Sequence, residues 1–118
     1  MSDSIIKHQK NIRQFAEERD WKQFHSPKNL SMAIATETAE LQEHFLWEDS
    51  PESWKTLNDP DKKTAISDEL ADIMIYCLRF ADVCDIDVSE AITRKMGINN
   101  NKYPVETSKG NSKKYTDL

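Results

Sequence analysis

Residues 59–84 read DPDKKTAISDELADIMIYCLRFADVC, and this stretch decides the fold. Asp59 followed by Pro60 is a typical helix start, because aspartate caps the first turn and proline fits its first position. Apolar side chains then recur every three or four residues, which is the spacing of a helix with one buried face. The stretch therefore predicts one long helix that ends near Cys84.

Similar signals divide the rest of the chain into helices. Ser26-Pro27 and Ser50-Pro51 repeat the start signal, and Asp87 with Glu90 resembles a capping box. These patterns predict helices over about residues 4–18, 27 to 45 or 47, 51–57, 60–84 and 87–101. No stretch of useful length alternates polar and apolar residues as a half-buried strand does. We therefore expect an all-α fold, most simply a four-helix bundle.

The composition indicates one small domain that gains stability from association. The chain has 118 residues, of which 37% are hydrophobic and 31% charged, so one copy has little apolar surface to bury. We therefore expect a homo-oligomer. We also expect a helical domain over residues 1–104 and an irregular basic tail over residues 105–118, where lysine and serine are scattered around Gly110.

Several classes of protein are disfavoured by what the sequence lacks. Two glycines are too few for a phosphate loop of the Walker or Rossmann type. The longest apolar run, residues 73–78, is far shorter than the ~20 residues of a membrane span, and the polar N-terminus does not resemble a signal peptide. Acidic residues outnumber basic ones before Thr93, which disfavours nucleic acid. We therefore expect a cytoplasmic protein without membrane or nucleic-acid partners.

Four carboxylates occupy places where a helix normally carries its apolar face. Glu69 and Asp72 fall within the apolar stripe of residues 60–84. On the preceding long helix, Glu37 falls within the stripe and Glu40 lies at its side. Carboxylates are rarely buried unless a cation accompanies them, because the loss of hydration costs several kcal/mol per ion. No lysine or arginine lies one turn away on either stripe, so the pattern predicts a divalent-metal site.

The donor set indicates which metal and which chemistry. Carboxylate oxygens alone suit hard cations, with Mg²⁺ first and Mn²⁺ as the alternative. A di-iron bundle would need Glu-x-x-His on two helices, and none of the residues three places before His8, His25 and His44 is acidic. Mg²⁺ that is held by few carboxylates keeps positions for water and substrate phosphates. The site therefore indicates metal-assisted hydrolysis of a phosphate ester or anhydride.

Three alternatives stay open at this point. A buried salt bridge to another element, for example through Arg79 or Lys95, would explain the carboxylates without a metal. A metal-free helical module that docks a protein partner would show no Mg²⁺-dependent change in any property. A different phosphohydrolase would use paired histidine and aspartate ligands, but no His-Asp pair occurs in the sequence.

The acidic residues also carry a family resemblance. Glu37-x-x-Glu40 and Glu69-x-x-Asp72 resemble the metal motif of the MazG-like all-α nucleoside triphosphate pyrophosphohydrolases. The flanking sequence is similar to the dCTP pyrophosphatase branch of this group over about residues 12–118. The matching stretches are FAEERDW at 15–21, QFH at 23–25, ELADI at 69–73 with Tyr76, KM at 95–96 with Asn99, KYP at 102–104 and KYTDL at 114–118.

The resemblance implies a reaction and a set of ligands. Members of this group cleave a nucleoside triphosphate between its α and β phosphorus atoms, with Mg²⁺ as cofactor, and release a monophosphate and pyrophosphate. Members of the branch form homotetramers in which neighbouring subunits complete each pocket. Glu43 continues the Glu-x-x-Glu series, which implies a contact with the attacking water or with a ligand. The implied catalytic and metal-binding residues are Glu37, Glu40, Glu69 and Asp72.

The resemblance also implies contacts to the substrate, with aromatic residues on the base and basic or amide residues on the phosphates. Core packing is the alternative explanation for Trp21 and Trp47. Arg79 departs from the branch, where an apolar residue is expected, and the base and sugar preference stays open. The implied substrate-binding residues are Trp21, His25, Trp47, Tyr76, Lys95, Asn99, Lys102 and Tyr103.

Overall fold

The computed structural model describes residues 3–118, and every regular element in that range is a helix. This confirms the predicted all-α fold. The long helices are α1 (Asp3–Glu18), α2 (Pro27–Glu43), α4 (Pro60–Val83) and α5 (Val88–Lys102). The short elements are η1 (Lys22–Phe24), α3 (Ser50–Thr56), α6 (Val105–Ser108) and η2 (Tyr115–Asp117). No helix among these residues is both long enough and apolar enough to cross a membrane.

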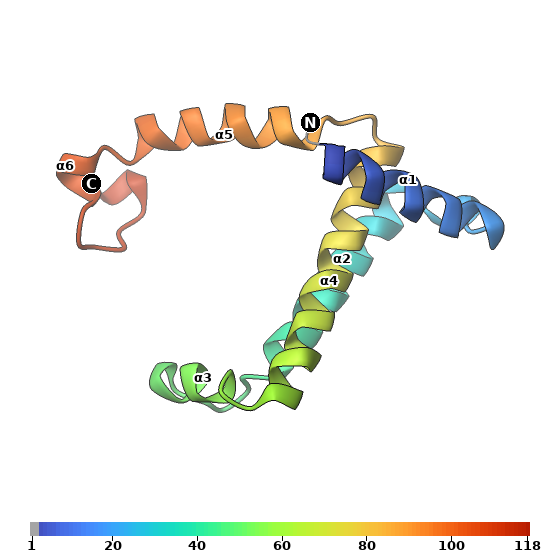
Figure 1. Ribbon diagram of the computed structural model, residues 1–118. Helices are drawn as coiled ribbons and strands as arrows, with labels where there is room; N and C mark the ends of the chain where they lie inside the picture. Colours follow the sequence, from blue (N-terminus) through green and yellow to red (C-terminus); the bar gives the residue numbers. More distant parts are fainter. Residues whose placement is uncertain (1–2) are drawn as a thin grey trace.

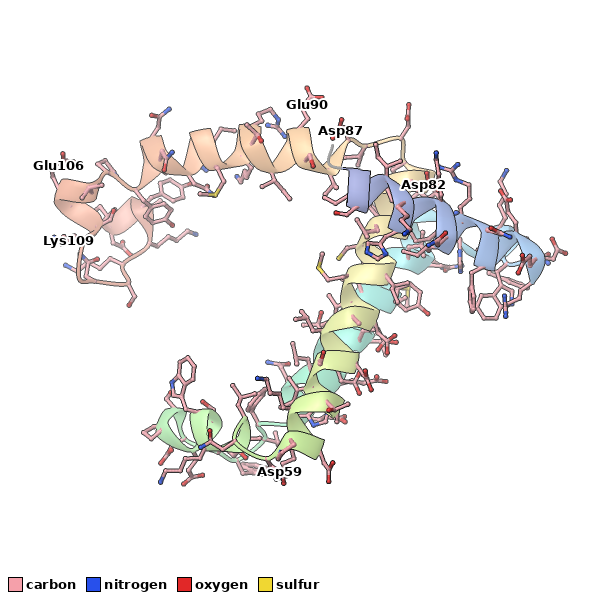
Figure 2. All side chains as sticks on the ribbon, in the orientation of Figure 1. Asp59, Asp82, Asp87, Glu90, Glu106 and Lys109 are labelled. Carbon is pink, nitrogen blue, oxygen red and sulfur yellow. The ribbon has the colours of Figure 1, made fainter. Side chains whose placement is uncertain are left out.

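Polar side chains cap the first turns of the helices whose starts the sequence predicted. Ser26 caps α2 by accepting a hydrogen bond from the amide three residues later, at 3.1 Å. Asp59 and Asp87 cap α4 and α5 in a similar way, and Figure 2 shows both at the first turn of their helices. At α3 the cap is Asp49 and not the predicted Ser50, which lies inside the helix. The Asp49 carboxylate accepts a hydrogen bond from a free amide of the first turn, and the positive end of the helix dipole stabilises its negative charge.

The core lies where three helices meet. α2 and α4 form an antiparallel pair, and α1 packs across the end of α4 (Figure 1). Ala16 of α1, Leu30 of α2 and Ala81 of α4 are the buried apolar residues among those described. The packing of α2 against α4 is what positions the acidic residues.

The fourth long helix is present, but it extends away from this core. Within one chain α5 does not lie alongside α2 and α4 (Figure 1). Apolar side chains consequently stay about half exposed on two helices, namely Leu70 and Met74 on α4 and Ile92 and Met96 on α5. The boundary between a helical domain and a tail at residue 104 stays a prediction.

Candidate functional site

Packing of α2 against α4 brings three carboxylates together. Glu37 and Glu40 are one turn apart on α2 and meet Glu69 of α4, and one oxygen atom from each lies within 4.8 Å of the other two. All three side chains are half-buried. We call these residues the carboxylate cluster. The structure thus brings together three of the four acidic residues that the sequence singled out.

The cluster has oxygen atoms without a hydrogen-bond donor. Oε2 of Glu37 and Oε2 of Glu69 are buried, and neither has a hydrogen-bond partner among residues 3–118. Burial raises the pKa of Glu37 above its ordinary range, and a hydrogen bond and the charge of Glu40 raise it further. Burial and Glu40 likewise raise the pKa of Glu69. Because each buried oxygen lacks a donor and each charge repels its neighbours, the residues present fit a hard divalent cation.

Asp72 lies at the edge of the cluster. It follows Glu69 by one turn of α4 and is exposed to solvent. Its negative charge contributes to the raised pKa of both Glu37 and Glu69, so it lies on the same side of the helix pair. Asp72 also shares a pocket with Glu37. It is therefore available as a fourth oxygen donor at the open side of the cluster.

Lysine and arginine give the salt-bridge alternative no support in the described part of the chain. No lysine or arginine there forms an ion pair with the cluster. Arg79 contacts His25 and Asp82 instead, and Lys95 lies on α5.

Reasoning from the sequence missed His44. Its Nε2 lies 3.8 Å from Oε1 of Glu69, and its charge opposes the rise in the pKa of Glu69. The sequence spacing could have indicated this contact. His44 follows Glu40 by four residues and Glu37 by seven, which places it on their side of a helix. A search for acidic residues three places before each histidine could not detect it.

An aromatic pocket adjoins the carboxylate cluster. Glu37 and Asp72 form one side of it, and the side chains of Trp21, His25 and Tyr76 form other walls together with Phe15 and Arg79. The ring centroids of Trp21 and Phe15 are 5.6 Å apart, and those of Trp21 and His25 are 6.3 Å apart. Three of the predicted substrate-binding residues therefore share one pocket with two of the predicted acids.

A tight helix end positions Trp21 at this pocket. Asp20 adopts a left-handed conformation with a φ of 54°, and the amide of Trp21 donates to the carbonyl of Ala16 at 2.9 Å. This is the hydrogen-bond pattern of a Schellman helix end, which reverses the chain direction after α1. The reversal turns the Trp21 ring back toward Phe15, so the pocket wall follows from how α1 ends.

Residues 32–118 match the sequence profile of the MazG-like family. The chain belongs to the MazG-like family. Among curated proteins it is 42% identical over 109 residues to dCTP pyrophosphatase 1 of Rattus norvegicus and 40% identical over 109 residues to that of Homo sapiens. Each match covers 89% of this chain but 62% of the relative, so the chain spans less than two thirds of their length.

A solved structure has the same fold. The chain is 37% identical to a pyrophosphatase from Archaeoglobus fulgidus, with a TM-score of 0.81 over 88% of this chain and 95% of that one. The profile match includes every residue of the carboxylate cluster and Asp72, whereas Trp21 and His25 precede it.

One copy of this MazG-like chain does not bring the remaining predicted site residues to the carboxylate cluster. Trp47 is 94% exposed, has a φ of 68°, and lies beyond the end of α2 in a surface pocket that Glu43 also lines. The predicted phosphate-binding residues lie on α5 or directly after it, and α5 extends away from the α2–α4 pair (Figure 1). These residues are Lys95, Asn99, Lys102 and Tyr103.

The turn after α4 explains the direction of α5. Asp85 has a φ of 54°, and the amide of Ile86 donates to the carbonyl of Ala81 at 2.8 Å, which repeats the pattern at the end of α1. Beyond α5 the ring of Tyr103 packs edge-on against Tyr115. The predicted phosphate ligands therefore lie outside the site that a single chain forms.

Proposed function

We propose that this chain hydrolyses dCTP, or a related deoxynucleoside triphosphate such as a 5-modified cytosine nucleotide, to the monophosphate and pyrophosphate. Such an activity would remove unwanted nucleotides from the pool. The observation that carries the proposal is the carboxylate cluster, which has two buried oxygens without a donor among the described residues and adjoins an aromatic pocket. The family and the pyrophosphatase names of the relatives support it.

The acidic residues would hold the metal. Glu37, Glu40, Glu69 and Asp72 would hold Mg²⁺, with Mn²⁺ as the alternative, because hard cations prefer several carboxylate oxygens. When bound, the cation would neutralise phosphate charge and make a bound water more acidic. A carboxylate oxygen of the site that does not bind the metal would orient the attacking water or accept its proton. Glu43 would contact this water or a ligand.

The aromatic pocket would hold the nucleobase. Trp21 and Tyr76 offer ring faces for stacking, and His25 offers a polar ring atom within the same walls. Trp47 has nothing to pack against among the described residues of its own chain, as its 94% exposure indicates. We propose that it covers the base when the oligomer forms.

A homotetramer would bring the phosphate ligands to the site. We propose that α5 of one subunit reaches the carboxylate cluster of another, where its residues would bind the phosphates and stabilise the departing pyrophosphate. The half-exposed apolar side chains on α4 and α5 support such an association. The residues involved would be Lys95, Asn99, Lys102 and Tyr103. A cytoplasmic location and the absence of nucleic-acid and membrane partners stay predictions from the sequence.

The test is an assay of reaction products. The protein is incubated with each canonical and 5-substituted deoxynucleoside triphosphate in Mg²⁺, and the products are separated by ion-exchange chromatography. We expect equal amounts of monophosphate and pyrophosphate, cytosine nucleotides as the best substrates, and loss of turnover in EDTA. Release of orthophosphate would contradict cleavage between the α and β phosphorus atoms. A metal-free interaction module would hydrolyse nothing.

A further inference from the structure

Arg79 of α4 is buried but lies outside the carboxylate cluster. Its side chain is 4% exposed and lines the aromatic pocket. Its Nε donates a hydrogen bond to Nδ1 of His25 at 3.0 Å, and its Nη1 donates to Oδ2 of Asp82 at 3.4 Å. Burial of an arginine carries a desolvation cost that an apolar residue would avoid. The position therefore indicates a role that an apolar side chain could not fill.

Asp82 is fixed in turn by Arg13 of α1. Nε of Arg13 donates to Oδ2 of Asp82 at 2.8 Å, and Nη2 of Arg13 donates to Oδ1. Figure 2 shows Asp82 where α1 crosses the end of α4. The hydrogen bond from Arg13 lowers the pKa of Asp82 below its ordinary range, so the carboxylate stays charged. Arg13, Asp82, Arg79 and His25 thus form a hydrogen-bonded relay that runs from the surface to the pocket.

This relay decides which nitrogen of His25 carries a hydrogen. Arginine can only donate, so Nδ1 of His25 accepts, and the neutral ring carries its hydrogen on Nε2. Burial lowers the pKa of His25, and the positive charge of Arg79 lowers it further. Among residues 3–118 the structure records no hydrogen bond from Nε2. His25 therefore presents one uncharged N–H donor to a pocket with aromatic walls.

Charge is distributed unevenly around this pocket. The acidic residues Glu37 of α2 and Asp72 of α4 lie on the side of the carboxylate cluster, where a cation and the triphosphate would bind. The relay reaches this pocket at the side that His25 and Arg79 form, and its charged members are Arg13, Arg79 and Asp82. A protonated imidazole on that side would attract phosphate, whereas a neutral N–H donor suits an uncharged carbonyl oxygen. The His25 side is therefore the place for the base.

We infer that Arg79 is a positioning residue that holds His25 as a neutral Nε2–H donor to a carbonyl oxygen of the nucleobase, which in cytosine is O2. The inference rests on the proposed function, because it takes a nucleotide to be the ligand. It assigns to this reaction a specificity determinant that lies outside the residues that would touch the phosphates. Phe15, Trp21 and Tyr76 hold the base plane, and His25 reads one atom on its edge.

The first test reads the ring of His25 directly and needs no catalysis. In ¹⁵N-labelled metal-free protein, long-range ¹H–¹⁵N spectra should show His25 with its hydrogen on Nε2, and the ring should titrate below the ordinary histidine range. Arg79→Leu should give a mixture of the two neutral forms and a higher pKa of His25. Arg94→Leu on exposed α5 is the matched control and should change neither property. A hydrogen on Nδ1 in the unmodified protein, or an unchanged spectrum in Arg79→Leu, would overturn the inference.

The second test removes the acceptor from the substrate. In 2-thio-dCTP a sulfur atom, which is a weak acceptor, replaces O2. The unmodified protein should show a KM about fivefold lower for dCTP than for 2-thio-dCTP, which is the size of one neutral hydrogen bond, with similar kcat. His25→Ala should bind the two nucleotides alike, and Arg79→Leu should keep only part of the preference, because only part of its His25 carries the hydrogen on Nε2. His25→Gln keeps a neutral N–H donor and should show part of the preference that His25→Ala loses.

The outcomes separate this inference from the proposed function. Hydrolysis of dCTP without any preference over 2-thio-dCTP would overturn the inference and leave the proposed function intact. If no nucleoside triphosphate is hydrolysed, the proposed function fails, and titration of the protein with dCMP and 2-thio-dCMP decides the inference. In that titration, a shift of the His25 signals by dCMP that exceeds the shift by 2-thio-dCMP supports it, and equal shifts overturn it.

Discussion

Glu37 and Glu69 face each other across the α2–α4 interface, each with one buried oxygen that lacks a hydrogen-bond partner among the described residues. The raised pKa of each carboxyl shows that the cluster resists being charged in the absence of a cation. Stability and metal binding should therefore be coupled in this chain, which several measurements can examine.

Glu69→Gln removes one charge from the cluster and keeps the shape of the side chain. We expect a loss of activity greater than the about 10–100-fold typical of residues that only support a metal ligand. The variant should also lose most of the Mg²⁺-induced rise in Tm, yet melt no lower than the unmodified protein in EDTA, because it relieves repulsion. Asp68→Asn, the exposed neighbour on α4, is the control and should behave like the unmodified protein. A Tm several degrees lower in EDTA for Glu69→Gln would favour a structural ion pair.

Mg²⁺ should stabilise the folded chain in proportion to its binding. Because only the folded state assembles the cluster, Mg²⁺ at a hundredfold excess over Kd should add about 2.7 kcal/mol to the free energy of unfolding. Thermal melts over a series of Mg²⁺ concentrations measure the effect, and EDTA should reverse it. A Tm that is independent of Mg²⁺ would favour the metal-free interaction module.

The metal-free protein should lose stability from this cluster as the pH rises. The pKa of Glu37 is raised by burial, so the folded chain keeps its proton in a window that begins near the ordinary value of about 4.3. Across that window the stability of the folded chain falls as the pH rises. Above the raised pKa, Glu37 is ionised in the folded chain and its full destabilising effect is present. The pKa values of Asp82 and His25 are lowered in the folded chain. These two groups therefore have the opposite effect, and through them the stability falls as the pH falls below their ordinary pKa values.

Glu37→Gln isolates the contribution of the cluster from the other two groups. Urea unfolding in EDTA should give the variant and the unmodified protein equal free energies of unfolding near pH 4.5. Toward pH 8 the variant should become increasingly more stable than the unmodified protein. Saturating Mg²⁺ should reverse that advantage, because the unmodified protein then gains the cation. If the difference in the free energy of unfolding between the two proteins does not change with pH, then ionisation of Glu37 does not destabilise the folded chain.

Trp47→Ala should affect substrate binding and leave the fold unchanged. Its side chain is 94% exposed, so little packing is lost. If it stacks on the base, KM for dCTP should rise by the equivalent of about 1–3 kcal/mol, with a smaller change in kcat. Trp54→Ala, another tryptophan that is mostly exposed at 74%, is the matched control and should leave KM unchanged. An unchanged KM in both variants would remove Trp47 from the base site.

A site shared between subunits predicts complementation. Lys95→Ala and Glu69→Gln should each be nearly inactive alone, because one lacks a phosphate ligand and the other a metal ligand. After the two are unfolded together and refolded as a mixture, sites that combine an intact α5 with an intact cluster should recover activity. A mixture that is no more active than its components would mean that each chain forms its site alone.

Local features of this fold could be predicted from the sequence because they depend on neighbours in the chain. Ser26, Asp59 and Asp87 cap their helices as predicted, since a cap needs only a side chain and the next turn. Glu37 and Glu69 could be predicted to meet because each interrupts an apolar stripe, and two stripes must pack together.

Other features depend on geometry that spacing does not contain. The direction of α5 depends on the left-handed conformation of Asp85, which aspartate adopts only in some turns. The contact between Arg79 and His25 joins residues 54 positions apart and requires the ends of α1 and α4 to be placed first. Reasoning from the sequence could therefore only leave the role of Arg79 open.

The proposed metal ligands and much of the proposed base pocket belong to different segments of the chain. The carboxylate cluster lies entirely on the α2–α4 hairpin, whereas Phe15, Trp21 and His25 come from α1 and the segment that follows it. If the proposed function is correct, substitutions in the first segment can therefore alter which base is accepted while every residue of the carboxylate cluster is kept. Such an arrangement would let substrate range change by substitution in one segment while the proposed metal site in the other stays the same.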